Sequence, residues 1–204
     1  MSEIYALSDD ALTPPQTIFS QIDEILRCGV KLVQYRSKLA AQDEALIRSL
    51  IGLCEDYGAK LIINDDAALA KKLGAHGVHI GADDGETAQV REFLGADKII
   101  GVSCYADLAR AQKAEAQGAS YVAFGSLRRG KTKPDAPLCP DALVQEARKS
   151  LNLPIAVIGG ISLENLNEIL ALKPDYIAMV EAIYRPASIT QNLANLKEKM
   201  DEYI

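Results

Sequence analysis

Short apolar runs alternate with amphipathic stretches along the whole chain. The stretch Lys60–Asp66 is typical, because a leucine and two isoleucines run directly into an asparagine and two aspartates. A run this short and this rich in isoleucine predicts a buried strand that turns polar where the chain leaves the core. Comparable runs are Ile4–Leu7, Val30–Gln34, Gly77–Ile80, Lys98–Val102, Tyr121–Phe124, Pro154–Ile158 and Tyr176–Val180.

Between these runs, apolar residues recur at the spacing of one helix face, and glycines often end the pattern. The first predicted helix opens at Pro14 and Pro15, carries apolar residues from Ile18 to Leu26 and is closed by Gly29. The other predicted helices are Leu46–Cys54, Ala67–Leu73, Glu86–Leu94, Leu108–Gln117, Asp141–Ser150, Leu163–Leu172 and Ile189–Tyr203. Strand and helix patterns alternate eight times, which predicts parallel strands joined by crossover helices. In 204 residues this favours an α/β fold of the (β/α)₈ TIM-barrel type, a single domain over residues 1–204. An open doubly wound sheet is the alternative.

Composition and net charge indicate which kinds of binding partner the protein is expected to have. Hydrophobic residues make up 49% of the chain and charged residues 25%, as in ordinary soluble globular proteins. The net charge of -6 argues against non-specific binding to nucleic acid or to an anionic membrane. No apolar stretch reaches the length of a membrane-spanning helix. The four cysteines lie far apart without a CxxC pair, which predicts free thiols and a cytoplasmic protein.

Basic residues gather where two predicted strands end. In a barrel of this type the active site lies at the C-terminal ends of the strands. Arg36 and Lys38 close an apolar strand, and we expect them to bind an anion such as a phosphate. The long polar loop Gly125–Pro140 adds further cations, namely Arg128, Arg129, Lys131 and Lys133. For most of these loop residues, surface charge on a solvated loop is an equally good interpretation.

Two aspartates follow neighbouring strands. Asp65 and Asp84 would converge beside the basic residues, and carboxylate oxygens together with a substrate phosphate are typical ligands of Mg²⁺. The alternative is that each aspartate caps the helix that follows it. Asp66 and Asp83 are the better candidates for capping or surface positions.

A glycine pair offers a second anion site. Gly159 and Gly160 follow a strand and precede the helix expected near Leu163, so their backbone N–H groups could approach a phosphate closely. Two histidines, in contrast, do not predict a metal site. Their three-residue spacing on a strand directs His76 and His79 to opposite faces, which favours structural roles.

Taken together, these motifs resemble the thiamine-phosphate synthase family, also called thiamine-phosphate pyrophosphorylase. The resemblance runs from Ile4 to about Tyr184 and keeps the family's order of motifs. The matching stretches are Leu32–Lys38, Leu61–Asp66, Gly77–Asp84, Ile99–Ser103, Tyr121–Pro134 and Pro154–Ile161. Six ordered motifs are far more specific than any one of them.

The resemblance implies a TIM-barrel transferase with small-molecule substrates. Such an enzyme joins hydroxymethylpyrimidine diphosphate to hydroxyethylthiazole phosphate with the help of Mg²⁺. It releases thiamine phosphate and pyrophosphate through a dissociative step in which the pyrimidine carries positive charge. Neither nucleic acid nor a membrane is an expected partner, and a homo-oligomer is left open.

By position, the resemblance also assigns roles to individual residues. Those assigned to the pyrimidine diphosphate are Gln34, Tyr35, Arg36, Ser37, Lys38, Asn64 and Lys133, with Ser103 at the pyrimidine ring. Those assigned to the thiazole phosphate are Gly130, Lys131, Thr132, Gly160, Val180 and Glu181. Asp65 and Asp84 are assigned to Mg²⁺. The residues expected to promote the reaction are Arg36, Lys38, Ser103 and Lys133.

Four positions depart from the family pattern. Ala82 replaces a usual glutamine, Gly130 a hydroxyl residue, Tyr105 a common histidine and Glu181 a frequent serine. A carboxylate beside a phosphate would repel it, so we expect the Glu181 side chain to face elsewhere. The departures leave two alternatives, a related thiazole tautomerase and a catalytically silent binding protein for thiamine precursors. The absence of a histidine at position 105 argues against the tautomerase, which needs a residue for proton transfer.

Overall fold

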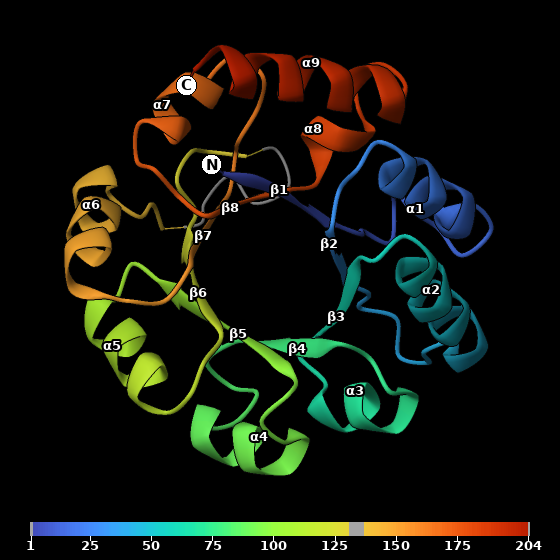
Figure 1. Ribbon diagram of the computed structural model, residues 1–204, viewed down its shortest axis with the longest axis horizontal. Coiled ribbons are helices and arrows are strands. Elements are labelled where there is room, and N and C mark those ends of the chain that lie inside the picture. Colours follow the sequence, from blue (N-terminus) through green and yellow to red (C-terminus); the bar gives the residue numbers. More distant parts are fainter. Residues whose placement is uncertain (1, 131–136, 204) are drawn as a thin grey trace.

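The computed structural model describes residues 2–130 and 137–203. Within them, eight parallel strands form a closed barrel in chain order, and β1 pairs with β8 to close it (Figure 1). The strands are β1 (Glu3–Leu7), β2 (Leu32–Tyr35), β3 (Lys60–Asn64), β4 (Gly77–Ile80), β5 (Ile99–Tyr105), β6 (Tyr121–Gly125), β7 (Ile155–Ile158) and β8 (Tyr176–Met179). The predicted (β/α)₈ TIM barrel is confirmed, and the open sheet is excluded.

Helices surround the barrel on its outside (Figure 1). They are α1 (Ile18–Arg27), α2 (Glu44–Asp56), α3 (Ala67–Leu73), α4 (Thr87–Leu94), α5 (Leu108–Ala116), α6 (Asp141–Ser150), α7 (Leu166–Leu170), α8 (Glu181–Tyr184) and α9 (Ile189–Glu202). In the described part of the chain, no helix combines the length and the apolar character needed to cross a membrane. Four helices begin with a side chain that accepts a backbone N–H three residues on, and the capping residues are Asp43, Asp66, Asp107 and Ser188.

The seventh helix is shorter than the sequence pattern predicts. It begins at Leu166 rather than near Leu163. The reason is a turn held by Asn165, whose side chain accepts the N–H of Ser162 at 3.0 Å and donates to the carbonyl of Gly160 at 2.8 Å. These side-chain bonds give the backbone an alternative to helical pairing, which delays the helix. The short helix α8 was not predicted from the sequence at all.

The core has two layers, one on each side of the strands. The outer layer lies between the sheet and the helices and includes Val33, Ile63 and Val78. The inner layer fills the barrel and consists of Tyr5, Leu7, Leu32, Ile62, Tyr121, Ala123, Ala156 and Ala178. Because side chains alternate along a strand, β1, β2, β3, β6, β7 and β8 each contribute buried apolar residues to both layers.

All four cysteines, each within the described residues, are free thiols, as the sequence predicts. Burial raises the pKa of the Cys54 and Cys104 thiols to about 12 and that of Cys139 to about 11. At neutral pH these thiols are therefore protonated, and the thiolate needed for nucleophilic chemistry is scarce.

Candidate active site

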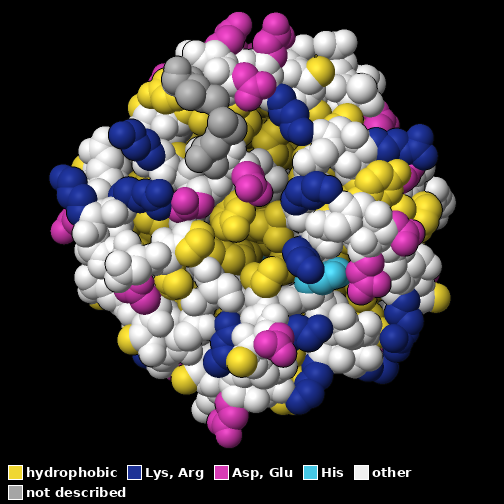
Figure 2. Space-filling model, viewed as in Figure 1, with side chains coloured by type: hydrophobic (Ala, Val, Ile, Leu, Met, Phe, Trp, Pro, Cys, Tyr) yellow, Lys and Arg dark blue, Asp and Glu magenta, His cyan; other side chains and the backbone are white. Residues whose placement is uncertain are grey.

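A cavity of about 950 Å³ lies at the C-terminal ends of the strands. Figure 2 views one end of the barrel, where a hydrophobic centre is surrounded by basic and acidic side chains. The cavity brings together most of the described residues that the sequence predicted for the site: Gln34, Arg36, Lys38, Asn64, Asp65, Asp84, Ser103, Gly130, Gly160, Val180 and Glu181. Lys131, Thr132 and Lys133 lie outside the described residues.

Two predicted residues do not reach this cavity. The Tyr35 side chain is buried in the layer between sheet and helices, and Ser37 lies with it beside a separate small recess. The reason is the alternation of side chains along the chain, which directs Gln34 and Arg36 inward and their neighbours outward. Tyr35 and Ser37 therefore do not line the cavity, and their assignment to the pyrimidine diphosphate stays a prediction.

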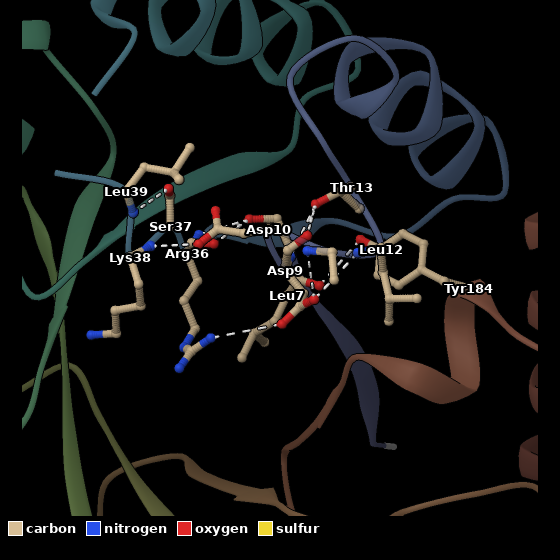
Figure 3. Close-up of polar contacts among 12 residues, drawn as sticks. Leu7, Asp9, Asp10, Leu12, Thr13, Arg36, Ser37, Lys38, Leu39 and Tyr184 are labelled. Atoms are coloured by element: carbon tan, nitrogen blue, oxygen red, sulfur yellow. Dashed lines mark hydrogen bonds and ion pairs between the residues drawn. The ribbon is translucent and has the colours of Figure 1, made fainter. Parts of the chain in front are cut away.

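The loop after β1 supports the two basic residues that follow β2 (Figure 3). Ser8 Oγ accepts the backbone N–H of Arg36 at 2.7 Å and donates to its carbonyl at 3.1 Å. Asp10 accepts the backbone N–H of Lys38 at 2.8 Å, and an Asp9 oxygen lies 4.0 Å from the Arg36 guanidinium. Both basic side chains extend in the same direction from this supported backbone. The loop contacts therefore present two cations together at the cavity.

The two predicted metal ligands interact with each other and with Lys38. The Lys38 ammonium lies 2.6 Å from Asp65 Oδ2, and Asp84 Oδ2 accepts the N–H of Gly81 at 2.6 Å. Burial raises the pKa of Asp84, and the nearby charge of Asp65 raises it further. Burial also disfavours the ionised form of Asp65, but Lys38 more than offsets this effect, so the pKa of Asp65 is lowered.

The capping alternative for Asp65 is resolved by its neighbour Asp66. Asp66 accepts the N–H of Leu69 at 2.8 Å and caps α3, as the sequence predicts. Asp65 instead adopts a left-handed backbone with φ of 67°, and its own N–H is bonded to the carbonyl of His79 at 2.8 Å. Asp65 is therefore available at the cavity rather than engaged at the helix.

Asp65 and Asp84 are residues of the kind that could together hold a divalent cation such as Mg²⁺. Their carboxylate oxygens are hard donors. Burial and the nearby charge of Asp65 raise the pKa of Asp84, and a bound divalent cation would oppose both effects. Among the described residues, no cluster of three or more His, Cys, Asp or Glu could hold a metal.

Arg128 has a structural role in this protein. Its guanidinium contacts both Asp141 oxygens at 2.7 and 2.8 Å and lies 3.1 Å from Glu168. The hydrogen bond to Asp141 contributes most to a raised pKa of Arg128. Because these acids come from α6 and from α7, Arg128 joins the loop after β6 to the outer helices. Its guanidinium is thus paired with protein carboxylates rather than directed at an anion in the cavity.

The glycine pair brings two loops into contact. Gly160 has φ of 62°, and a Cβ built there would lie 2.6 Å from the carbonyl oxygen of Arg128. A Cβ on Gly130 would lie 3.5 Å from the Gly160 nitrogen, so the loops after β6 and β7 meet at these glycines. Because α7 begins only at Leu166, the Gly160 N–H does not belong to a helix N-terminus. Glu181 lines the cavity, so the expectation that its side chain faces elsewhere is not confirmed.

The floor of the cavity contains polar residues that sequence reasoning did not assign to the site. His79 bonds through Nδ1 to the Tyr121 hydroxyl and through Nε2 to Ser103 Oγ, each at 2.8 Å. Burial lowers the pKa of His79 to about 4, so the ring is neutral at physiological pH. The sequence-based interpretation of a structurally satisfied histidine holds, but His79 also lines the cavity. Strict alternation within β4 and β6 could have indicated His79 and Tyr121 as inward-facing residues.

Comparisons with known proteins agree with this geometry. A sequence model described as thiamine monophosphate synthase matches residues 4–183. The chain belongs to this family. A thiamine-phosphate synthase of Nitrosococcus oceani is 44% identical over 190 residues, covering 91% of this chain and 87% of the relative. A thiamine-phosphate synthase of an Azoarcus species is 43% identical over 192 residues, covering 92% of both chains.

A solved structure extends the similarity to three dimensions. The thiamine phosphate pyrophosphorylase of Pyrococcus furiosus superposes with a TM-score of 0.88 at 26% identity, covering 99% of this chain and 96% of that structure. The family resemblance stated from the sequence motifs is therefore confirmed.

Proposed function

We propose that this protein is a thiamine-phosphate synthase that joins hydroxymethylpyrimidine diphosphate to hydroxyethylthiazole phosphate. The observation that carries the proposal is one barrel cavity in which Arg36, Lys38, Asp65 and Asp84 lie together. It is supported by relatives of that name that match about nine tenths of the chain. The proposal includes Mg²⁺ as the metal and the cytoplasm as the location, for which the free thiols are supporting evidence.

The basic and acidic residues suit the departure of pyrophosphate. Arg36 offers several N–H donors to phosphate oxygens and Lys38 a compact charge, so both would stabilise the leaving group more as its charge develops. Asp65 and Asp84 would hold Mg²⁺, which when bound neutralises diphosphate charge as a Lewis acid. Lys133 and Asn64 are proposed to contact the same diphosphate.

The cavity floor and walls suit a positively charged pyrimidine. Gln34 and Ser103 lie at the floor, where they would orient the ring for attack by the thiazole nitrogen. Leu7, Ile158 and Met179 contribute apolar surface to the same cavity, which would keep water from capturing the cation. The bond to pyrophosphate would be broken with the help of the cations around the leaving group and of the positioned substrates. The reaction therefore requires no protein nucleophile, in agreement with the protonated cysteine thiols.

The thiazole phosphate is proposed to bind at the opposite wall. The loops that meet at Gly130 and Gly160 expose backbone rather than side chains, and Lys131, Thr132 and Val180 complete this part of the proposed site. Glu181 also lines the cavity.

One assay tests the proposal directly. Purified protein is incubated with both precursors and Mg²⁺, and thiamine phosphate is measured, with parallel reactions that lack Mg²⁺ or the thiazole phosphate. We expect product only in the complete mixture. Folded protein that forms no thiamine phosphate would overturn the proposal. The same assay separates it from a thiazole tautomerase and a silent binding protein, because neither forms thiamine phosphate.

A further inference from the structure

Five side chains form a continuous hydrogen-bonded chain across the barrel floor. Gln34 Nε2 lies 2.8 Å from the Tyr5 hydroxyl, which lies 2.9 Å from the Tyr121 hydroxyl. Tyr121 then contacts His79 Nδ1, and His79 Nε2 contacts Ser103, each at 2.8 Å. The five residues come from β2, β1, β6, β4 and β5, and the two ends, Gln34 and Ser103, both line the cavity.

One arrangement of protons gives every donor in this chain an acceptor within it. Each tyrosine has one proton to donate, and neutral His79 donates from one nitrogen and accepts at the other. Gln34 Nε2 donates to the Tyr5 hydroxyl. In this arrangement Tyr5 then donates to Tyr121, Tyr121 donates to His79 Nδ1, and His79 donates from Nε2 to Ser103 Oγ.

This direction determines what the two ends present to the cavity. The Ser103 oxygen accepts from His79, which leaves the Ser103 proton to donate toward the cavity. At the other end, the amide nitrogen of Gln34 is used by Tyr5. Among the described residues, no hydrogen bond to its amide oxygen is found. Gln34 is buried and lines the cavity, so this oxygen is the group that it has left to accept a hydrogen bond from a ligand.

We propose that Tyr5, Tyr121 and His79 are positioning residues that couple the two ends, so that Gln34 presents an acceptor whenever Ser103 presents a donor. The site then selects a ring that carries an N–H donor toward Gln34 and an acceptor toward Ser103. An aminopyrimidine has both, in its amino group and its ring nitrogens. An oxo-pyrimidine presents an acceptor in place of the amino donor toward Gln34. To bind it, Gln34 would have to present a donor, and every hydrogen bond in the chain would then have to exchange its donor and acceptor. The identity of the ring rests on the proposed function.

Packing around Tyr121 gives this chain a fixed geometry. The Tyr121 ring stacks on His79 with centroids 5.6 Å apart and meets the Tyr5 and Tyr176 rings edge-on at 5.9 Å. It fits there because residue 101 is glycine: a Cβ at that position would lie 2.0 Å from the Tyr121 ring. The substitution Tyr121→Phe therefore keeps the packing and removes only the hydroxyl that joins Tyr5 to His79.

The first test measures the tautomer of His79 without any ligand. Nitrogen NMR of the free protein should show His79 protonated at Nε2, and Tyr121→Phe should shift both ring nitrogens toward averaged values. His76 provides an internal reference, because its Nδ1 accepts the N–H of Leu61 at 3.1 Å and should not change. Protonation at Nδ1 in the unmodified protein, or signals unaltered by Tyr121→Phe, would overturn the proposed direction.

The second test measures selectivity. Binding of amino- and oxo-hydroxymethylpyrimidine diphosphate is compared in the presence of Mg²⁺ and without the thiazole substrate. We expect the unmodified protein to prefer the amino compound and Tyr121→Phe to reduce this preference by about tenfold or more. Tyr57→Phe is the matched control, since its hydroxyl contacts Asp23 at 2.8 Å on the outside of the barrel. It should keep the full preference.

The outcomes separate this inference from the proposed function. If the unmodified protein makes thiamine phosphate but Tyr121→Phe keeps the full preference, the coupling is wrong and the function stands. If the unmodified protein makes no thiamine phosphate, the function is wrong, and the His79 tautomer still decides whether the chain has the proposed direction.

Discussion

Asp65 and Asp66 are adjacent in the sequence but act on different properties of the protein. Asp66 caps α3, so Asp66→Ala should lower the free energy of unfolding by about 1 kcal/mol and leave thiamine phosphate formation nearly unchanged. Asp65→Asn should reduce activity strongly, with only the small loss of stability expected from a partly exposed ion pair with Lys38. Urea unfolding and the activity assay together check this, and the reverse pattern would contradict both assignments.

Asp84 should determine the response to Mg²⁺. Its pKa in the folded protein is raised, so the protonated form stabilises the fold at low pH and that contribution is lost as pH rises through the folded pKa. At neutral pH, Asp84→Asn should therefore melt at or slightly above the temperature of the unmodified metal-free protein. Added Mg²⁺ with pyrimidine diphosphate should raise the melting temperature of the unmodified protein but not of this variant.

The control for this prediction is Asp83→Asn, which changes the neighbouring exposed aspartate. This variant should respond to Mg²⁺ like the unmodified protein. An equal response of all three proteins would remove Asp84 from the metal site.

Lys38 should control the ionisation of Asp65. Burial disfavours the ionised form of Asp65, but Lys38 outweighs this effect and lowers the Asp65 pKa. Ionised Asp65 therefore stabilises the folded protein at pH values above the unfolded pKa. This stabilisation is lost as pH falls through the folded pKa. Lys38→Met should raise the Asp65 pKa, and the loss should begin at higher pH. Carboxyl NMR titration measures this. Lys72→Met, which removes a comparable exposed pair with Glu44, should leave Asp65 unchanged.

Some residues of the candidate site could be predicted from the sequence, and others could not. Gln34 and Arg36 were found because polar residues at the end of an apolar strand stand out. Tyr35 and Ser37 do not line the cavity because side chains alternate along the chain, which a motif read as a contiguous stretch does not take into account. His79 and Tyr121 were missed because apolar surroundings in the sequence conceal hydrogen bonds that form only between distant strands.

At the scale of elements, the packing of β5 against β6 depends on Gly101, because the Tyr121 ring occupies the space that a side chain at residue 101 would need. A Cβ at residue 101 would lie 2.0 Å from the Tyr121 ring, so Gly101→Ala should destabilise the protein by about 1–3 kcal/mol. Gly52→Ala is the matched control, because Gly52 lies within α2 and a Cβ there meets nothing within 4 Å. It should stabilise the protein by about 0.5–1 kcal/mol. Thermal or urea unfolding of both variants gives the comparison, and equal effects would contradict it.

The beginnings of helices follow local chemistry that a hydrophobic pattern does not report. The cap at Asp66 is visible in the sequence because the side chain acts within its own turn. The delayed start of α7 is not, because the Asn165 side chain could equally have pointed to solvent. Its two bonds to Gly160 and Ser162 depend on the path of the loop after β7.

At the scale of the whole molecule, α9 covers α1, α7 and α8 on the outside of the barrel (Figure 1). Four of its apolar residues, Ile189, Leu193, Leu196 and Met200, are buried. Burial of such side chains contributes about 1.5–3 kcal/mol each, a total comparable with the whole stability of a typical domain. A chain truncated after Ala187 should therefore fail to fold cooperatively. Circular dichroism during heating measures this, and a retained sharp transition would contradict it.

The sequence by itself determined the order of strands and helices, the barrel class and the family, because these follow from local periodicity and contiguous motifs. It also placed the aspartates and basic residues at strand ends. Only the tertiary structure decided which of those side chains share the cavity, which pair with each other, and how Gln34 and Ser103 are joined through three residues from other strands. The physical reason is that hydrogen bonds and charge interactions depend on distances between strands, which ring closure sets and local sequence does not encode.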